Sequence, residues 1–383
     1  MVYDLIVYTP MYVTAFWAIV LLALSARPNK PQKFLGIFML LAFGVYLSHA
    51  LYFNNQYQLY LYFDPVYTFT SLSVYPMYYW YIKRLTSEQE TNYRNLIMFV
   101  PATVLALAGS ITLLAMNSAE RSDYIQDFLF QSRKDSGDDM LLLIQITIFV
   151  TSRIVFMIQV VIFLFLGKRL VLRHNARIAN FYSNTENRKL DWVNVFLYSF
   201  LVTSMMSMVF NIIGRSVFNH SSVLLIIPSA IFSILLFTIG FQGHIQNYSA
   251  EEIDIAENVS PEVTLREYNQ VLLREKLIWL FEEDKIFKQT DLKITQVALA
   301  LQTNRTYVSN LINTEFKVTF CEFVNKYRVE EAKKMLSDTK QQQFTLDFIA
   351  ESAGFGSVNS FIRIFKDFEQ MTPGKFREKK ILG

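Results

Sequence analysis

The sequence has 383 residues, of which 52% are hydrophobic and only 18% are charged. A soluble domain carries about 25% charged residues, and a disordered chain is rich in charge and poor in apolar residues, so this composition argues against both. The single cysteine, Cys321, excludes an internal disulfide and a cysteine-based zinc site. The four histidines lie far apart in the sequence, so we expect neither a local metal motif nor a cofactor.

Long uncharged runs make up most of the first two thirds of the chain. Each run reaches or approaches the roughly 20 residues that a helix needs to cross the hydrocarbon core of a membrane. The runs are Leu5–Ala26, Phe34–Phe53, Leu59–Ile82, Leu96–Ala115, Met140–Gly167, Trp192–Ile213 and Val223–Phe241. We therefore predict an all-α fold in which a seven-span transmembrane bundle, residues 1–245, precedes a cytoplasmic all-helical domain.

The loops between these runs differ in their basic residues. With the N-terminus outside, the inner loops carry twelve Lys and Arg residues and the outer loops carry four. Basic residues concentrate on the cytoplasmic side of membrane proteins, so this bias supports that orientation. Seven spans then place residues 242–383 in the cytoplasm, where reducing conditions suit the free thiol of Cys321.

Two charged residues lie inside the predicted spans. Arg153 lies midway along its span, where a charge costs several kcal/mol, and Asp64 is the only acidic residue in a span. The helical rise separates their depths by about 12 Å, which favours a loose or water-bridged pairing. We interpret Asp64 and Arg153 as a candidate intramembrane ligand site. The alternative is that Arg153 extends its charge toward the membrane surface.

The composition changes near residue 246. Residues 246–260 are polar and acidic and predict a linker, and Ser260-Pro261-Glu262 is typical of a helix start. Residues 261–383 follow as a separate helical domain. The helix that begins at Pro261 has an apolar stripe wider than one neighbouring unit requires, which indicates either a homodimer contact or packing within its own domain. The stripe consists of Leu265, Tyr268, Leu272, Leu273 and Trp279.

The first of two helix-turn-helix patterns in this domain covers Ile294–Asn313. Gln302-Thr303 forms the turn, and Asn304 is a favourable N-cap for the second helix. The apolar stripes of the two helices are Ile294, Val297, Ala298 and Leu301, followed by Val308, Leu311 and Ile312. The opposite face is polar with one charge, Arg305, which suits the reading of DNA base edges. A plain helical hairpin with a solvated face has the same pattern.

The second pattern covers Leu346–Phe368. Gly354-Phe355-Gly356 forms its turn, and Ser357 caps the next helix 53 residues after Asn304. The inward residues are predicted to be Leu346, Ile349 and Ala350, followed by Phe361, Ile364, Phe365 and Phe368. Between the two patterns, Phe320–Leu336 predicts a helix about 25 Å long. Such a helix can hold two recognition helices about one DNA turn apart, roughly 34 Å.

These residues resemble the C-terminal signature of the AraC/XylS family of bacterial transcription regulators. The resemblance covers residues 272–380 and rests on agreement in register across both units. Its residues are Tyr327-Arg328, Glu331-Ala332, Leu336, Ile349-Ala350, Gly354-Phe355, Ser357, Phe361, Arg363, Phe365-Lys366, Thr372-Pro373 and Phe376-Arg377. The resemblance implies a DNA-binding domain with two helix-turn-helix units that read adjacent major grooves.

The resemblance also implies roles for single residues. It assigns base reading to Thr306, Ser309, Asn310, Asn359 and Arg363, while contacts with DNA phosphates are expected from Arg305, Lys366, Lys375 and Arg377. An ion pair with Asp367 is the alternative role for Arg363. The family usually has glycine in the turn after each recognition helix, whereas this sequence has Lys317 and Gln370. Because glycine commonly lies where φ is positive, we expect both turns to be strained or rebuilt.

The leading hypothesis is a membrane-bound one-component transcription regulator of a bacterial inner membrane, and not an enzyme. Its expected partners are double-stranded DNA, membrane lipid, a second copy of the chain, and an unknown small-molecule or envelope signal. The sequence contains neither a phosphate-binding GxxxxGK[ST] loop nor a zinc-binding HExxH motif. The alternatives are a permease with a regulatory tail, and a sensor whose DNA-binding tail is released by proteolysis in the linker.

Overall fold

The structure, a computed structural model, describes residues 2–24, 30–54, 56–86, 93–130, 139–186, 188–213, 223–245, 270–338 and 344–382. Within these ranges the chain is helical without any strand, and one isolated bridge pairs Tyr182 with Lys293. The all-α prediction is therefore confirmed for the described part. The predicted linker, the helix start at Pro261, and Leu265 and Tyr268 lie outside the described residues.

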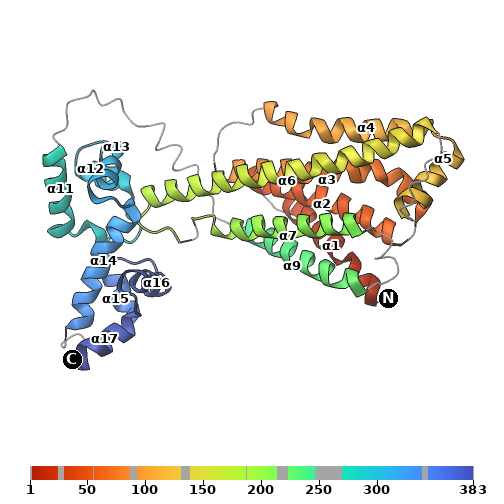
Figure 1. Cartoon of the computed structure of the whole chain (residues 1–383). Helices are drawn as coiled ribbons and strands as arrows, with labels where there is room; N and C mark the ends of the chain where they lie inside the picture. Colours follow the sequence, from red (N-terminus) through yellow and green to blue (C-terminus); the bar gives the residue numbers. More distant parts are fainter. Residues whose placement is uncertain are drawn as a thin grey trace. The chain divides into compact units, whose positions relative to one another are not determined.

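Helices occupy the positions of all seven predicted spans (Figure 1). They are α1 (Val2–Ile19) with the π-helical turn η1 (Val20–Leu24), α2 (Lys30–Phe53), α3 (Tyr57–Thr86), α4 (Val100–Ala115), α6 (Met140–Phe181), α7 (Asp191–Ile213) and α9 (Val223–Ile245). The short elements are η2 (Tyr93–Phe99), α5 (Ser118–Ser122) and η3 (Asp123–Phe130). Among the described residues, four helices are long and apolar enough to cross a membrane, so the count of seven spans stays a prediction. These four are Pro31–Phe53, Arg94–Ala115, Met140–Phe181 and Leu225–Ile245.

The chain forms two compact units. The first consists of Met1–Val171 and Asp191–Gln246, and the second of Leu172–Leu190 and Asn247–Gly383. The second unit therefore includes the end of α6 and the loop after it, residues that the sequence analysis assigns to the membrane domain. Because α6 is a single helix from Met140 to Phe181, it belongs to both units.

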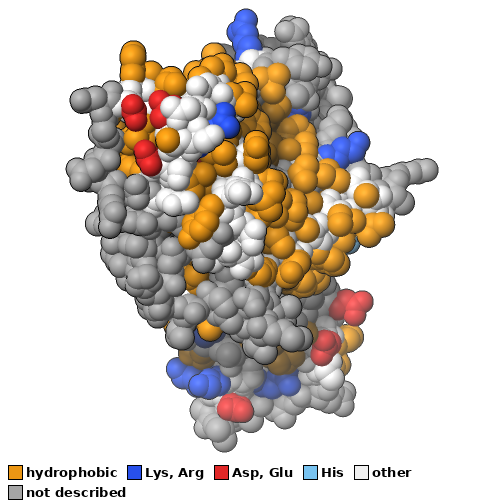
Figure 2. Space-filling model, turned by 90° about the vertical axis from the view of Figure 1, so that its right-hand side faces the viewer, with side chains coloured by type: hydrophobic (Ala, Val, Ile, Leu, Met, Phe, Trp, Pro, Cys, Tyr) orange, Lys and Arg blue, Asp and Glu red, His pale blue; other side chains and the backbone are white. Residues whose placement is uncertain are grey.

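In the first unit, α2 packs against α1 and α3, α1 packs against α9, and α3 packs against α4. Aromatic rings fill the space between these helices. Phe196, for example, lies with its ring centroid 4.9 Å from Tyr78 and 5.4 Å from Phe38. Large apolar side chains also point outward, among them Ile111 and Leu114 of α4 and Phe165 of α6. Figure 2 shows hydrophobic side chains spread over much of one face. An apolar exterior around an aromatic interior is unusual for a soluble protein.

The second unit contains the predicted pair of helix-turn-helix patterns. Its elements are α11 (Gln270–Glu282), η4 (Ile286–Lys288), α12 (Ile294–Ala300), α13 (Arg305–Leu311), η5 (Ile312–Phe316), α14 (Phe320–Ser337), α15 (Leu346–Ser352), α16 (Val358–Glu369) and α17 (Pro373–Leu382). The four apolar residues predicted for the first helix, Ile294 to Leu301, are all buried. The connecting helix is confirmed as α14, which begins with a capping box between Thr319 and Glu322.

The turns of the two helix-turn-helix units have equivalent backbone conformations. Gln302 and Gly354 each end the first helix with a positive φ, 53° and 89°. The following amides, of Thr303 and Phe355, donate to the carbonyls of Ala298 and Ala350 at 2.9 and 2.8 Å. Such bonds satisfy the last carbonyls of a helix. Gly354 has a second constraint, since a Cβ there would lie 2.7 Å from the Lys288 carbonyl oxygen.

Lys317 and Gln370 adopt the left-handed conformation that the family's usual glycines at these turns indicate, with φ values of 55° and 57°. The Gln370 side chain partly compensates by donating to the Asp367 carbonyl at 2.8 Å. The Lys317 side chain is exposed. A residue other than glycine in this conformation costs about 1–2 kcal/mol, so Lys317 is the clearest strained position after the first recognition helix.

We predict that Lys317→Gly raises the free energy of unfolding of the second unit by about 1 kcal/mol, because glycine removes this strain. Amide hydrogen exchange of α13 and α14 in the full chain measures the change. Lys326→Gly is a matched control, since it removes the same charge from an exposed position inside α14. It should lower stability by about 1 kcal/mol. Equal shifts in the same direction would contradict the strain argument.

Candidate nucleic-acid interface

The helix α13 has the geometry of a recognition helix. Its N-cap is confirmed, because the Asn304 side chain accepts a hydrogen bond from the Thr306 amide at 2.9 Å. Val308 and Leu311 are buried below the helix, whereas Thr306 and Asn310 are exposed on the other side. Ser309 is half-buried and its hydroxyl accepts from the Asn313 amide at 3.4 Å. Thr306, Ser309 and Asn310 therefore form a polar, nearly uncharged face.

The helix α16 repeats this arrangement in the second unit. Its N-cap is also confirmed, because the Ser357 hydroxyl accepts from the Ser360 amide at 3.1 Å. Asn359 and Arg363 are exposed on the outer side. No ion pair between Arg363 and Asp367 is present in this described helix, so the guanidinium is available for another acceptor.

The prediction that Phe368 points inward is wrong. Phe361 and Phe365 are fully buried, as predicted, but Phe368 is 42% exposed. The helical spacing places all three on related faces, yet Phe368 lies on the last turn of α16, one turn beyond Phe365. The apolar periodicity of α16 therefore extends one turn beyond the buried core.

The four predicted phosphate-binding side chains differ in their surroundings. Lys366 and Lys375 are exposed, and Arg305 is half-buried. Arg377 is also half-buried and donates one guanidinium hydrogen bond to the Phe344 carbonyl at 2.9 Å. Arg377 therefore also helps to hold the start of the second unit.

The helix α14 connects the two helix-turn-helix units. Its 18 residues span about 27 Å. Lys333 of α14 pairs with Glu369 at the end of α16 at 2.9 Å, and Arg328 places its guanidinium carbon 5.9 Å from the centre of the Phe355 ring. The second helix-turn-helix unit is therefore attached to α14 by contacts at both its turn and the end of its recognition helix.

Arg328 is the polar centre of the domain and has a role that the sequence analysis does not predict. It is 1% exposed and donates to the carbonyls of Phe287 at 2.8 Å, Gln289 at 2.6 Å and Thr290 at 3.2 Å. Burial lowers the pKa of Arg328 to about 10. The sequence signal was its place in the family resemblance, which indicates importance without naming these partners.

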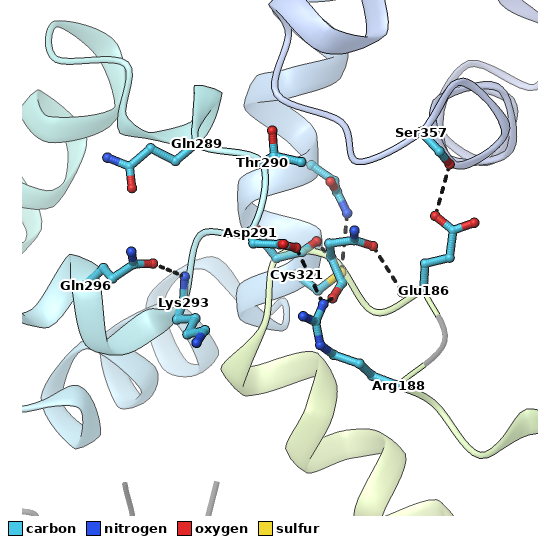
Figure 3. Close-up of polar contacts among 12 residues, drawn as sticks. Glu186, Arg188, Gln289, Thr290, Asp291, Lys293, Gln296, Cys321 and Ser357 are labelled. Carbon is cyan, nitrogen blue, oxygen red and sulfur yellow. Dashed lines mark hydrogen bonds and ion pairs between the residues drawn. The ribbon is translucent and has the colours of Figure 1, made fainter. Parts of the chain in front are cut away.

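A further set of residues around this centre comes from outside the predicted domain. Tyr182, Ser183, Glu186 and Arg188 belong to the loop after α6 and contact residues of both helix-turn-helix units (Figure 3). They are polar loop residues with no periodic pattern, so the sequence contains no local signal for this contact.

Comparisons with known proteins agree with this geometry. Residues 288–379 match the family model described as Helix-turn-helix domain, of the AraC type, which confirms the resemblance for this segment. Over 92 residues the chain is 33% identical to an uncharacterized HTH-type transcriptional regulator of Bacillus subtilis (strain 168), YtdP, covering 24% of this chain and 12% of YtdP. Over 85 residues it is 32% identical to a second one from the same strain, YisR, covering 22% of this chain and 29% of YisR.

The matched segment thus spans less than a third of the length of either relative. No solved structure matches the chain.

Proposed function

We propose that this protein is a membrane-bound one-component transcription regulator, which binds specific DNA through α13 and α16 under the control of a signal sensed by its N-terminal helices. The observation that carries the proposal is the pair of capped recognition helices with exposed polar faces in the AraC-type segment. The apolar helices of the same chain support the membrane attachment.

In this proposal the two recognition helices read base edges in adjacent major grooves. Thr306, Ser309 and Asn310 supply small donors and acceptors in the first groove, and Asn359 and Arg363 read the second. Arginine donates two hydrogen bonds to guanine in the commonest specific contact of this kind. Arg305, Lys366, Lys375 and Arg377 contact phosphates and fix the position of the domain without reading sequence.

We predict that Arg363→Ala weakens binding to the selected DNA site by about 1–3 kcal/mol and relaxes base preference in one half of the site. Lys375→Ala should weaken binding to all sequences alike and reduce the salt dependence, because each phosphate contact releases counterions. Binding of the full chain in lipid nanodiscs to specific and random duplexes, at several salt concentrations, measures both effects. If Arg363→Ala weakens specific and random DNA equally, Arg363 contacts phosphate and the base-reading assignment fails.

The membrane part of the proposal rests on the apolar helices and on the loop charges. We propose a multi-pass protein of a bacterial cytoplasmic membrane, with seven spans, the N-terminus outside and the DNA-binding domain in the cytoplasm. Lipid is then the partner of the exposed apolar side chains on helices such as α4 and α6. DNA binding by a membrane protein requires that its C-terminal domain lie on the cytoplasmic side.

Thiol labelling tests this orientation. In a Cys321→Ser background, a single cysteine at position 136, outside the described residues, should react with an impermeant reagent in intact cells. A cysteine at position 383 should react only after the cells are opened. The opposite pattern would remove the basis for DNA binding by the membrane-bound chain. A blot that shows a fragment of about 130 residues, rather than the intact chain, would favour the proteolytic alternative.

A cavity in the first unit is our candidate for the sensing site. It has a volume of about 120 Å³ and lies among aromatic and small polar side chains of α2, α3, α7 and α9, including Tyr46, His49, Tyr75 and Ser204. The hydroxyls of Tyr75 and Ser204 form a hydrogen bond on its wall. A cavity of this character favours a small uncharged ligand with an apolar body and one or two polar groups.

Of the two charged residues that the sequence singles out, Arg153 reaches a residue of the cavity wall, because it contacts Tyr67, which lines the cavity. Arg153 donates to the Tyr67 hydroxyl at 3.2 Å and lies over the Phe149 ring at 4.5 Å. Asp64 is buried one turn before Tyr67 and accepts from the Tyr124 hydroxyl at 2.9 Å. We propose that they orient the wall of the site from separate positions.

Filling the cavity tests the sensing proposal. Ser204→Leu places a larger apolar side chain at its wall and should fix promoter output at one level across growth conditions that change the output of the wild type. Thr238→Leu is a control, because Thr238 does not line this cavity and its hydroxyl donates to the Ile234 carbonyl within α9. A wild-type response in Ser204→Leu would exclude this cavity as the sensing site.

A homodimer is the remaining part of the proposal. On α11, Leu273 is buried within its own domain, whereas Leu272 and Trp279 are 45% and 57% exposed. The two exposed side chains support a contact with a second copy, and two copies in one membrane would gain affinity for paired DNA sites through effective concentration. Cross-linking of the full chain in membranes through a cysteine at position 279 tests this contact.

A further inference from the structure

The end of α6 and the loop after it pack into the AraC-type domain. We define the clamp as residues 178–186 and 188. Its apolar residues Ile178, Phe181 and Tyr182 are at most 3% exposed and belong to the same core as Leu277, Phe281, Leu292 and Val308. These three side chains precede the predicted DNA-binding domain, residues 261–383, by about 80 residues, yet they form part of the interior of its first helix-turn-helix unit.

Polar contacts fix the clamp to the segments on either side of the first helix-turn-helix unit. The Ser183 amide donates to the Leu292 carbonyl at 3.0 Å, and Arg328 donates to the Ser183 hydroxyl at 3.1 Å. The Cys321 thiol donates to the Ser183 carbonyl at 3.3 Å. Arg188 lies 4.4 Å over the Tyr182 ring and pairs with Asp291 at 3.5 Å. The clamp therefore contacts the loop before α12 and the start of α14 at once.

The clamp also reaches the second unit, at the start of its recognition helix. The Ser357 hydroxyl donates to the Glu186 carboxylate at 3.0 Å, while the same hydroxyl caps α16 (Figure 3). The Asn184 amide packs so closely on Gly356 that a Cβ there would lie 2.4 Å from its nitrogen. A carboxylate near the first turn of a helix is favourable, so this contact holds α16 at its cap.

We propose that the clamp sets the arrangement of the two recognition helices relative to each other, and that α6, whose end forms part of the clamp, is the element through which that arrangement is controlled. The inference rests on the proposed DNA binding. The surface of the AraC-type domain described above is thus bound by a segment of the same chain, the clamp. When the clamp is docked, it joins α16 to the first helix-turn-helix unit. When the clamp is released, only α14 and its direct contacts hold the second helix-turn-helix unit.

DNA with altered spacing tests the clamp. The full chain in lipid nanodiscs is bound to its selected site and to the same site with two base pairs inserted between the halves. Glu186→Ala should reduce the preference for the selected spacing about fivefold, since a hydrogen bond to a charged group is lost. Glu186→Gln, which keeps an acceptor, should show a smaller reduction. Glu283→Ala removes the same charge from an exposed site on the same domain and should leave the preference unchanged.

Cys321 is a native probe of clamp release that does not depend on DNA. Its thiol contacts Ser183, and burial raises its pKa, so it should react slowly with a maleimide in the wild type. Glu186→Ala should raise the labelling rate about threefold to tenfold, with Glu283→Ala at the wild-type rate. Hydrogen exchange of α14 establishes that the variants remain folded. If Glu186→Ala does not fold, Glu186→Gln replaces it in the labelling experiment.

The outcomes separate the two proposals. If the wild type shows no sequence-specific DNA binding, the proposed function fails, and labelling of Cys321 still decides whether the clamp is docked. If the wild type binds specifically but Glu186→Ala keeps both the spacing preference and the labelling rate, the clamp does not set the arrangement of the recognition helices and the inference is overturned.

Discussion

The buried guanidinium of Arg328 is the interaction on which the C-terminal domain depends. Its donors satisfy three carbonyls of residues 287–290, which connect α11 to the first helix-turn-helix unit, and one hydroxyl of the clamp. A buried acceptor left without a partner costs about 1–3 kcal/mol. Loss of Arg328 would leave several such acceptors at once and would disconnect α14 from the loop at residues 287–290 and from the clamp, three segments that the helical periodicity alone cannot join. One turn further along α14, Glu331 pairs with Lys288 at 2.8 Å and Lys285 at 3.3 Å, so the same loop is fixed to α14 twice.

This polar centre also explains why the two units are not independent. Burial favours a larger pKa for Glu331, but the ammonium groups of Lys288 and Lys285 hold its pKa below the usual range. The carboxylate is therefore charged at neutral pH and balances the cations next to Arg328. The turn of the second unit packs on the same loop, because Gly354 lies against Lys288. The loop at residues 285–290 is thus shared by α14, both units and, through Arg328, the clamp.

The sequence predicts those features that depend on neighbouring residues. The caps Asn304 and Ser357 and the extent of α14 follow from signals within the local sequence, whereas the left-handed Lys317 and Gln370 are indicated by the family resemblance. The clamp depends on contacts between residues 145 positions apart, such as Arg328 with Ser183. Its loop has no apolar period and no motif, so only the folded chain brings it to the domain. Phe368 illustrates the opposite error, since its position continues a valid pattern beyond the core. The site residues for DNA were assigned by resemblance, and the structure supplies only their exposure.

The proposed control from the membrane needs an element with two arrangements, because a ligand shifts an equilibrium only by its difference in affinity for the two states. A helix moves as a unit when its hydrogen bonds stay intact, and α6 is continuous from the first unit to Phe181. The clamp at its end combines three buried apolar side chains with two contacts to the second helix-turn-helix unit, the hydrogen bond of Glu186 with Ser357 and the packing of Asn184 on Gly356. The apolar anchor is costly to withdraw, whereas the contact of Glu186 with Ser357 is a single hydrogen bond. In the proposed mechanism, loss of this hydrogen bond loosens the clamp as a whole, at Ser183 as well as at Ser357, and thereby frees the second helix-turn-helix unit.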